Sequence, residues 1–507
     1  MAATFGIDFG TTNSLITVIS TGIMATKKRP YVLTHEGKPH PSVVWYGGTV
    51  PVAGKEAKDH LSQLGLGVFG NFVRSPKIFL GSPYGISVGG IKKEASDVVA
   101  DLLGFLRKEA TSSSFKGNSF ESAVITIPVT MRGPARAELR FAAQKAGIRI
   151  HQFVHEPLAA LYGYLRRDTN FGQTIAELER RLVLVFDWGG GTLDLTLCQV
   201  QNGLLMQIAN LGDTEVGGDA FDLRLRNLIR RKHEENFPNS DWSLVQPNAD
   251  ARLLQACEDL KIGLSEHSKR SLFISDYLAT PGPEKDIYAE ISRAEFEELV
   301  ADLIIKGIEN IRSLLEIAGI NREAIEFCLA TGGMVAMPAI KGSLREIFGM
   351  NRLKMPESAA TLISEGAAWI AHDEARLQTA KAIEVLNAGN TFVEIIPAGV
   401  NLPLAEESIE KSVDMYCVDP TDGYAKFLFA RPKWPGKEAH GDERIPYTLM
   451  SLNVDSQSQP FFERLHVKVR IDENLIAEIR TLSLMRGEKK EAKIHDLEFG
   501  LKLKGSD

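Results

Sequence analysis

The chain has 507 residues, 44% of them hydrophobic and 24% charged, a composition typical of a globular protein with roughly two to four domains. Its formal net charge of −7 gives no electrostatic reason to expect nucleic acid or an anionic membrane as a partner, and no segment approaches the roughly 18 consecutive apolar residues of a membrane span. The four cysteines (Cys198, Cys257, Cys328 and Cys417) are too widely spaced for a disulfide framework or a zinc site, so a reducing, cytoplasmic location is expected.

A glycine turn with acidic and hydroxyl residues lies near the start of the chain. Asp8 ends an apolar segment, and a second apolar segment occupies 15–19. The turn between them consists of Gly10, Thr11, Thr12 and Asn13. The pattern predicts two strands joined by a turn. Glycine lets a ligand approach the backbone N–H groups, as a polyphosphate requires, and a neighbouring carboxylate suits hydrated Mg²⁺.

The segment 71–81 contains Asn71, Lys77 and Gly81. On residue type alone, Lys77 would be a solvated lysine. What distinguishes Lys77 is its spacing from the asparagine and the glycine.

An apolar strand is predicted at 123–127, ending at Pro128, and a helical segment through Arg136 follows it. The next helix is expected to begin at Glu156, because Pro157 suits the first helical position. Taken alone, Glu156 would be an acid that caps a helix N-terminus.

The central hairpin repeats the plan of the first one. Asp187 ends a buried apolar strand, Asp194 begins the next, and both flank a turn. The turn contains Gly189, Gly190, Gly191 and Thr192, and a second glycine pair, Gly217 and Gly218, lies downstream. Such a turn can bind phosphate and Mg²⁺, although by itself it could equally be a glycine-rich hairpin with ordinary polar ends.

The rest of the first part of the chain reads as helices and one further glycine turn. Glu258, Lys261 and Ser265 lie three or four residues apart, on one helix face. A capping box at 292–295 opens a long predicted helix that ends before Gly319. A short apolar strand then leads to a turn formed by Gly332 and Gly333.

The pattern changes after about residue 378. A polar connector occupies 379–391, and from residue 392 apolar and polar residues alternate with period two, as in 465–471. This alternation predicts half-buried antiparallel strands.

Two Asp-Gly-Thr hairpins and a Gly-Gly turn form the signature of the actin, sugar-kinase and heat-shock ATPase superfamily. Three further features resemble the DnaK-type (seventy-kilodalton) heat-shock chaperone family: the spacing of Asn71, Lys77 and Gly81, the Glu156-Pro157 pair, and the segment 212–222. The resemblance covers nearly the whole chain. The resemblance implies an α/β two-lobed actin-like ATPase domain at 1–378, a linker at 379–391 and an antiparallel β-sandwich substrate-binding domain at 392–507. This β domain is expected to be truncated and to lack the family's helical lid, which are departures from the family pattern.

The resemblance also implies residue roles. Lys77, Glu156, Asp187 and Thr192 would be catalytic, and Asp8, Asp187 and Asp194 would hold Mg²⁺. ATP or ADP would contact Gly10, Thr11, Thr12, Asn13, Gly189, Gly190, Gly191, Thr192, Gly217, Gly218, Glu258, Lys261, Ser265, Gly332 and Gly333, with K⁺ as a further candidate ion. Pro128, Arg136 and Glu156 would form a switch that relays the nucleotide state to the linker.

Four positions depart from the family pattern: Ala220, Ile262, Met334 and Ala336. Two of them replace arginines of the family pattern. Ile262 stands where an arginine usually stacks on adenine, and Ala336 stands at the arginine position of a Ser-x-Arg motif. The leading interpretation is an ATP-driven chaperone that binds unfolded or extended polypeptides or one dedicated partner, with a J-domain protein and an exchange factor as candidate partners. The alternative is a nucleotide-binding scaffold without turnover; a sugar kinase and an actin-like filament fit less well.

Overall fold

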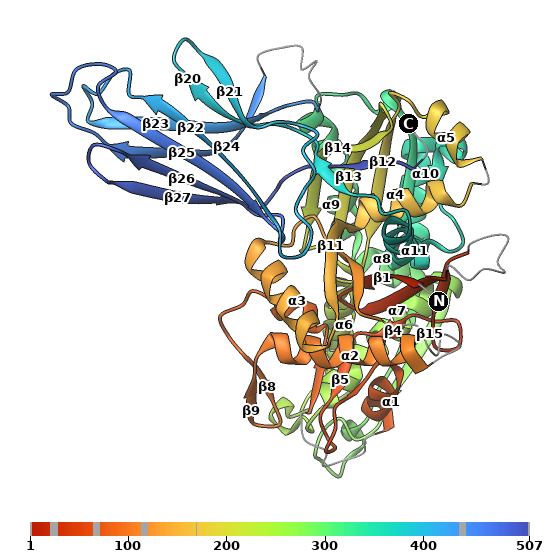
Figure 1. Cartoon of the computed structure of the whole chain (residues 1–507). Helices are drawn as coiled ribbons and strands as arrows, with labels where there is room; N and C mark the ends of the chain where they lie inside the picture. Colours follow the sequence, from red (N-terminus) through yellow and green to blue (C-terminus); the bar gives the residue numbers. More distant parts are fainter. Residues whose placement is uncertain are drawn as a thin grey trace.

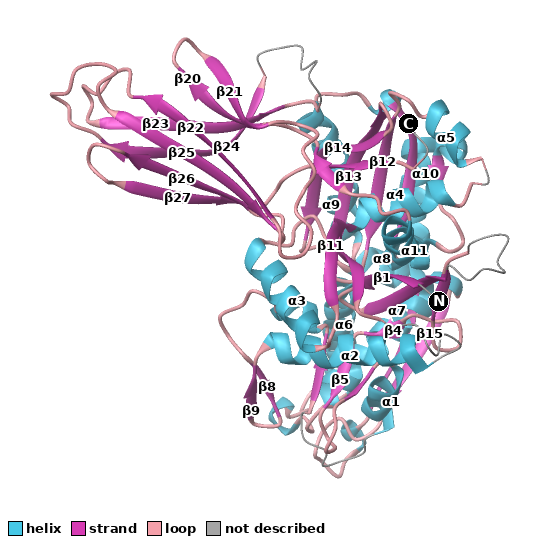
Figure 2. Ribbon diagram, viewed as in Figure 1, coloured by secondary structure: helices cyan, strands magenta, loops and turns pink. Residues whose placement is uncertain are grey.

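A computed structural model describes residues 3–20, 29–63, 71–112, 120–168, 170–435 and 443–504. The predicted domains also include 1–2 and 505–507, which lie outside the described residues. The described chain forms a body of two α/β lobes, from which a module made of strands projects to one side (Figures 1 and 2). Among these residues, no helix has the length and apolar character needed to cross a membrane.

The first lobe is built on a mixed sheet with the order β11-β10-β1-β2-β3, and β4 also pairs with β2. Its strands are β1 (Ala3–Phe9), β2 (Asn13–Ser20), β3 (Tyr31–Leu33), β4 (His40–Pro41), β10 (Ser122–Ile127) and β11 (Arg149–His155). The surrounding elements are β5 (Val43–Trp45), β6 (Val52–Ala53), α1 (Lys55–Gln63), β7 (Phe72–Arg74), η1 (Pro76–Phe79), β8 (Ile86–Val88), β9 (Ile91–Lys93), α2 (Ala95–Ser112) and α3 (Gly133–Lys145). The predicted first hairpin is confirmed, because β1 and β2 pair antiparallel around the glycine turn.

The second lobe is built on a seven-stranded sheet with the order β18-β17-β12-β13-β14-β28-β19. Its strands are β12 (Leu182–Trp188), β13 (Leu193–Gln201), β14 (Leu204–Asp213), β17 (Ile325–Thr331), β18 (Leu353–Lys354), β19 (Leu377–Thr379) and β28 (Phe499–Lys502). The surrounding elements are α5 (Phe171–Glu177), α6 (Gly218–Asn236), η2 (Trp242–Leu244), α7 (Ala249–Glu266), β15 (Lys269–Ile274), η3 (Pro283–Lys285), β16 (Ile287–Ser292), α8 (Arg293–Leu299), α9 (Ala301–Ala318), η4 (Arg322–Ala324), η5 (Gly333–Ala336) and α10 (Pro338–Arg352). The central hairpin is confirmed as β12 paired with β13.

Two helices join the lobes. Helix α4 (Glu156–Arg166) packs against β12 and β13, and α11 (Ala359–His372) packs against β1 and β2. The helices also pack on each other so closely that a Cβ on Gly366 would lie 1.8 Å from the carbonyl oxygen of Ala159. The packed helices thereby hold the sheets of the two lobes in a fixed position relative to each other.

The helix predictions have different outcomes. Helix α4 begins at Glu156 with proline in its first turn, as predicted. The Ser292 half of the capping box is confirmed, because the Ser292 hydroxyl accepts a hydrogen bond from the Glu295 amide. The single long helix is wrong, since Val300 leaves helical geometry at φ −113° and separates α8 from α9.

The module contains two four-stranded antiparallel sheets, with the orders β21-β20-β23-β24 and β22-β25-β26-β27. The strands are β20 (Ile383–Asn387), β21 (Thr391–Ile396), β22 (Ser408–Tyr416), β23 (Tyr424–Pro432), β24 (Arg444–Asn453), β25 (Arg464–Asp472), β26 (Ala477–Ser483) and β27 (Lys489–Ile494). The predicted alternation is confirmed in β25, where Leu465, Val467, Val469 and Ile471 are buried.

The structure differs from the predicted domain boundaries at two points. The range 379–391, predicted to be a linker, contains all of β20, so only residues 380–382 connect β19 to the module. The segment after β27 was assigned to the β domain, but it forms β28 in the sheet of the second lobe. Pairing with distant strands is a tertiary contact, which period-two alternation does not reveal.

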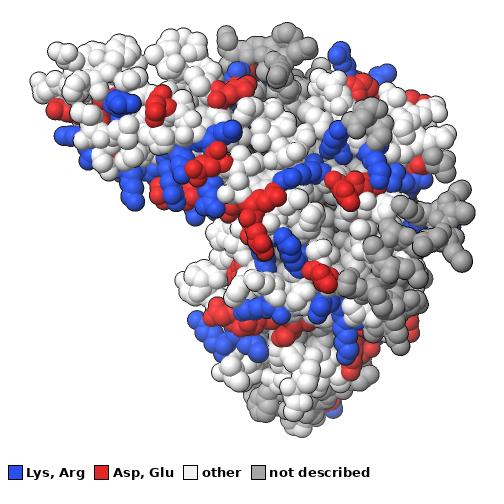
Figure 3. Space-filling view, in the orientation of Figure 1, with Lys and Arg blue, Asp and Glu red and all other residues white. Residues whose placement is uncertain are grey.

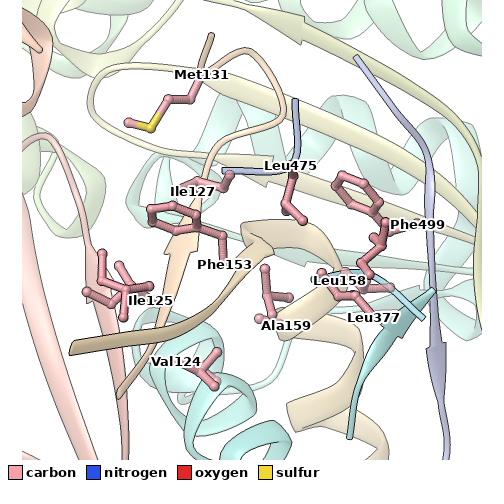
Figure 4. Packing of buried hydrophobic residues seen from close by; sticks show 14 of the residues in the cluster. Val124, Ile125, Ile127, Met131, Phe153, Leu158, Ala159, Leu377, Leu475 and Phe499 are labelled. Carbon is pink, nitrogen blue, oxygen red and sulfur yellow. The ribbon is translucent and has the colours of Figure 1, made fainter. Parts of the chain in front are cut away.

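One apolar core is continuous from the first lobe into the module. Figure 4 shows Leu377 of β19, Leu475 of the β25–β26 turn and Phe499 of β28 beside Phe153 and Leu158 of the body. A second core fills the other face of the second lobe's sheet. The module is therefore packed against the body and is not separated from it by an open linker.

Candidate functional site

A cavity of about 360 Å³ lies between the two lobes, a size within the usual range for a small-molecule site. It is lined by most of the residues singled out from the sequence: Asp8, Gly10, Thr11, Thr12, Asn13, Lys77, Glu156, Asp187, Gly189, Gly190, Gly191, Thr192, Glu258, Lys261, Ser265, Gly332 and Gly333. Asp194, Gly217 and Gly218 do not line it and lie behind its wall.

The two glycine turns meet at the floor of this cavity. A Cβ on Gly190 would lie 1.9 Å from the Thr12 hydroxyl, and a Cβ on Gly191 would lie 2.4 Å from the Thr11 hydroxyl. Only glycine permits this approach. Within the described part of the chain, the Thr12 hydroxyl is buried and has no hydrogen-bond partner. An acceptor or ion bound in the cavity would satisfy it, which is an observation in favour of a polar ligand.

Three aspartates surround the turns, each held by a hydroxyl. Thr126 donates to Asp8 over 3.1 Å, Thr331 donates to Asp187 over 3.0 Å, and Thr192 donates to Asp194 over 2.6 Å. Asp194 also accepts the Val129 amide of the first lobe at 3.0 Å. Asp194 thus fixes the turn that carries Thr192 and links the lobes, while Asp8 and Asp187 face the cavity.

Lys77 and Glu156 form an ion pair on the opposite wall, with 2.8 Å between Nζ and Oε1. Lys77 lies in η1, which follows Ser75 in a left-handed conformation at φ 52°. Glu156 begins α4, where the positive end of the helix dipole favours a carboxylate. Both side chains are largely buried. The prediction that Lys77 is more than a solvated surface lysine therefore agrees with its position.

Burial raises the pKa values of the aspartates at this site strongly. Burial and the neighbouring Glu156 carboxylate raise the pKa of Asp8 to about 7, and the same two causes raise the pKa of Asp194 to about 7. Burial, followed by the charges of Glu156 and Asp194, also raises the pKa of Asp187 well above its ordinary value. Deprotonating all of these groups beside a single lysine is unfavourable without further positive charge.

The donor set therefore fits a hydrated divalent cation. Mg²⁺ retains most of its water and binds proteins through one or two carboxylates together with a substrate phosphate. Among the described residues, no cluster of three or more histidine, cysteine, aspartate or glutamate side chains forms a ready-made metal cage. The arrangement suits Asp8 and Asp187 as partners of bound water.

The face of α7 predicted to bind the nucleoside is partly engaged within the protein. The Lys261 ammonium lies 2.9 Å from both the Gly218 carbonyl and the Asp222 carboxylate. Glu258 accepts a hydrogen bond from Arg74 at 3.1 Å. These contacts place both side chains at the wall of the cavity, and Ser265 is one helical turn beyond Lys261.

Sequence reasoning missed several apolar residues that line the cavity. They are Leu15, Pro39, Met337, Ala359, Ala360 and Ile363. The signal available was the proline that begins α10 after Met337 and the small residues that open α11. Ile262 and Ala336, noted as departures from the family pattern, also line the cavity.

The other predicted switch residues lie away from the cavity. Pro128 follows β10, directly before the Val129 amide that binds Asp194. Arg136 is completely buried in α3 and reaches the β module: its guanidinium donates to the Leu475 carbonyl at 3.2 Å and the His495 carbonyl at 2.9 Å. Arg136 is therefore a contact between the body and the module.

Comparisons with known proteins identify the relatives of this arrangement. The sequence model for the family described as Hsp70 protein matches residues 83–383, more than half of the chain. The chaperone protein DnaK of Deinococcus radiodurans is 31% identical over 391 residues, which cover 71% of this chain and 58% of that protein. DnaK of Deinococcus deserti matches to the same extent, and DnaK of Deinococcus proteolyticus is 30% identical over 416 residues, covering 76% of this chain and 62% of that protein.

The match thus spans about three-fifths of the length of these relatives. It includes the actin-like two-lobed ATPase fold, which the family shares. The chain belongs to the Hsp70 family.

Proposed function

We propose that this protein binds ATP with Mg²⁺ in the cavity between the lobes, hydrolyses it slowly, and uses its β module to hold extended polypeptide. One observation carries the proposal. The Lys77–Glu156 ion pair faces Asp8 and Asp187 across two glycine turns, all of them lining one cavity. This arrangement combines a phosphate cradle, a fixed cation and sites for a hydrated metal, which are the parts that phosphoryl transfer requires.

The backbone and side-chain groups of the cavity have separate roles in this proposal. The backbone of Gly10, Gly190 and Gly191 approaches the phosphates, and Lys77 supports the charge that develops on the transferred phosphoryl group. Thr192, held by Asp194, orients the attacking water. Mg²⁺ when bound would neutralise phosphate charge and order the water that Asp8 and Asp187 hold.

The test is single-turnover hydrolysis of ATP by the purified chain, with Mg²⁺ and with a chelator. Slow, Mg²⁺-dependent formation of ADP is expected. Binding of ATP without any ADP formation would instead support the alternative, a nucleotide-binding scaffold. That alternative is favoured by Ile262 and Ala336, which line the cavity and stand where the family pattern has arginines.

The first prediction concerns ATP affinity. Ile262 lines the cavity and is 55% exposed, so it can offer only apolar contact to a base. An arginine stacked on adenine contributes roughly 0.5–2 kcal/mol. Ile262→Arg should therefore tighten ATP binding by about two-fold to thirty-fold in titration calorimetry. No gain would mean that Ile262 does not face the base.

The second prediction concerns pH. The pKa values of Asp8 and Asp194, about 7, are raised above the ordinary value of 3.8, so the folded protein holds protons that the unfolded chain has already lost. The stability of the nucleotide-free protein should consequently fall as pH rises from about 4 to about 7. Mg²⁺ needs the deprotonated form of Asp8, which faces the cavity, so Mg²⁺–ATP affinity should rise by about tenfold from pH 6 to pH 8 as this proton is displaced.

Calorimetry in two buffers of different ionisation enthalpy measures this proton release. Asp8→Asn removes one of the two groups and should flatten the dependence. Equal affinity at pH 6 and pH 8 in the unchanged protein would show that these carboxyls do not titrate on binding.

The third prediction concerns the polypeptide. A sheet with an unpaired edge can add an extended peptide through main-chain hydrogen bonds. Among the residues that the structure describes, β22 is such an edge strand in the module. We expect the peptide to be released fast and ATP to change the release rate only modestly. The same result is expected for an unfolded chain and for one dedicated partner. It is also expected with or without a J-domain protein or an exchange factor. Stopped-flow release of a labelled peptide measures this. Acceleration by ATP of about a hundredfold, or about 2.7 kcal/mol of coupling, would contradict it.

A further inference from the structure

Strand β28 returns from the β module and completes the sheet of the second lobe. It pairs antiparallel with β14 on one side, through Leu501 opposite Leu205, and with β19 on the other. The Leu503 amide then donates to the Gly203 carbonyl at 2.9 Å. Because β19 leads into the module and β28 leads out of it, both connections between module and body are held in neighbouring strands of one sheet.

The two connecting segments are also bonded to each other. The Ala380 amide donates to the Glu498 carbonyl at 3.1 Å, and the Lys381 ammonium lies 3.2 Å from the Glu498 carboxylate. Lys381 also donates to the Ile208 carbonyl of β14 at 2.7 Å. On the module side, Arg431 of β23 lies 3.0 Å from the same carboxylate. One buried glutamate thus joins the connector, the sheet and the module.

Across the rest of the junction, acidic and basic groups of the body and module lie side by side (Figure 3). Arg140 donates to the Glu473 carbonyl and to the Asn474 side chain at 2.9 Å. The Gly133 amide donates to the His495 ring at 3.2 Å. These bonds hold the same turns that Arg136 contacts. Several independent hydrogen bonds therefore keep the module in its docked position.

A short chain of side chains runs from β28 to the ion pair of the cavity. The Phe499 amide donates to Gln207 Oε1 at 3.0 Å, and the Gln207 amide group lies 3.2 Å from Nδ1 of His155. The Phe499 ring also packs on the His155 ring, with 4.8 Å between centroids. His155 directly precedes Glu156, whose carboxylate binds Lys77. All of these side chains are buried.

We propose that β28 is a clasp: it holds the module docked on the ATPase lobes, and through Gln207 and His155 it fixes the orientation of Glu156. Pairing of β28 with the sheet and orientation of Glu156 in the cavity are then coupled in a single equilibrium. Gln207 is a positioning residue in this scheme and does not touch the reacting atoms. By reciprocity, a ligand that engages the oriented Glu156 and Lys77 must also stabilise the seated strand. This second half rests on the proposed nucleotide function, whereas the first half does not.

Hydrogen exchange of the full chain without nucleotide tests the first half. Gln207→Leu removes the acceptor of the Phe499 amide and the partner of His155. We expect exchange at 499–502 and at 153–157 to accelerate by at least about fivefold, with no change in β15 and β16. Asn210→Leu is the matched control, because it removes the hydrogen bond that Thr196 donates within β13 and β14 without contacting β28. Acceleration at 499–502 alone, or in neither segment, or equally in the control, would overturn the proposal.

Exchange of the unchanged protein with Mg²⁺ and ADP tests the second half. Protection of the Gly189–Thr192 turn reports binding, and we expect exchange of the Phe499 amide to slow by about threefold or more at the same time. The slowing should be lost in Gln207→Leu and kept in Asn210→Leu. Protection of the turn with an unchanged β28 would overturn the coupling. If ADP protects nothing, the proposed function fails, and the nucleotide-free experiment decides the clasp by itself.

Discussion

Replacing Lys77 with alanine is expected to slow ATP hydrolysis by about 10²–10³-fold, because it removes a preorganised donor to the charge of the transition state. The glycine turns that approach the phosphates are untouched, so ATP should still bind. The loss also removes the Lys77 charge, which lowers the pKa of Asp8. The residual activity should therefore need a higher pH than that of the unchanged protein.

Single-turnover assays at several pH values, beside calorimetric ATP binding, measure these effects. Lys232→Ala is a suitable control, since this lysine pairs with Glu295 at 2.7 Å on the second lobe and is remote from the cavity. Hydrolysis that is unchanged in Lys77→Ala would remove the lysine from the catalytic assignment. Loss of ATP binding together with turnover would show that Lys77 holds the ground state as strongly as the transition state.

The cavity floor could be predicted because its residues are consecutive in the sequence. A glycine turn between an aspartate and an apolar strand is a local pattern, and it occurs twice, at Asp8 and at Asp187. The structure brings the two turns into contact through Gly190 and Thr12. Local conformation and chemistry coincide there, so sequence alone identifies the residues.

The apolar lining of the cavity could not be predicted in the same way. Pro39, Met337 and Ile363 come from three distant segments and carry no chemistry that distinguishes them from core residues. The segment that forms β28 was assigned to the wrong domain for a related reason. Its apolar residues suit any buried strand, and only the pairing with β14 and β19 decides which sheet it joins. Contacts between remote segments are set by the whole fold.

Arg136 shows how a residue can be singled out from the sequence although its contacts cannot be foreseen. The resemblance marked it as a switch residue, and the structure places its guanidinium against backbone carbonyls of both the body and the module. Burial lowers the pKa of Arg136 to about 10, so it remains protonated and donates at neutral pH. The alternation of the module's strands gave no sign that their turns would meet it.

Arg136→Ala is therefore expected to lower the free energy of unfolding by about 2–4 kcal/mol, since buried carbonyls at Met131, Leu475 and His495 would lose a charged donor. Arg136→Met keeps the apolar stem and should recover only the packing share of that loss. Arg312→Ala, which breaks an exposed pair on α9, should change stability by less than about 0.5 kcal/mol.

Urea unfolding and small-angle scattering together locate the damage. If Arg136 holds the module on the body, its loss should expand the protein at urea concentrations where the lobes remain folded, because the junction opens before the cores do. Arg136→Met should expand at nearly the same concentration as Arg136→Ala, since neither can donate to Leu475 or His495. An unfolding midpoint equal to that of Arg312→Ala would show that water replaces the guanidinium at no cost, and that the remaining contacts, led by Glu498 and β28, hold the module without it.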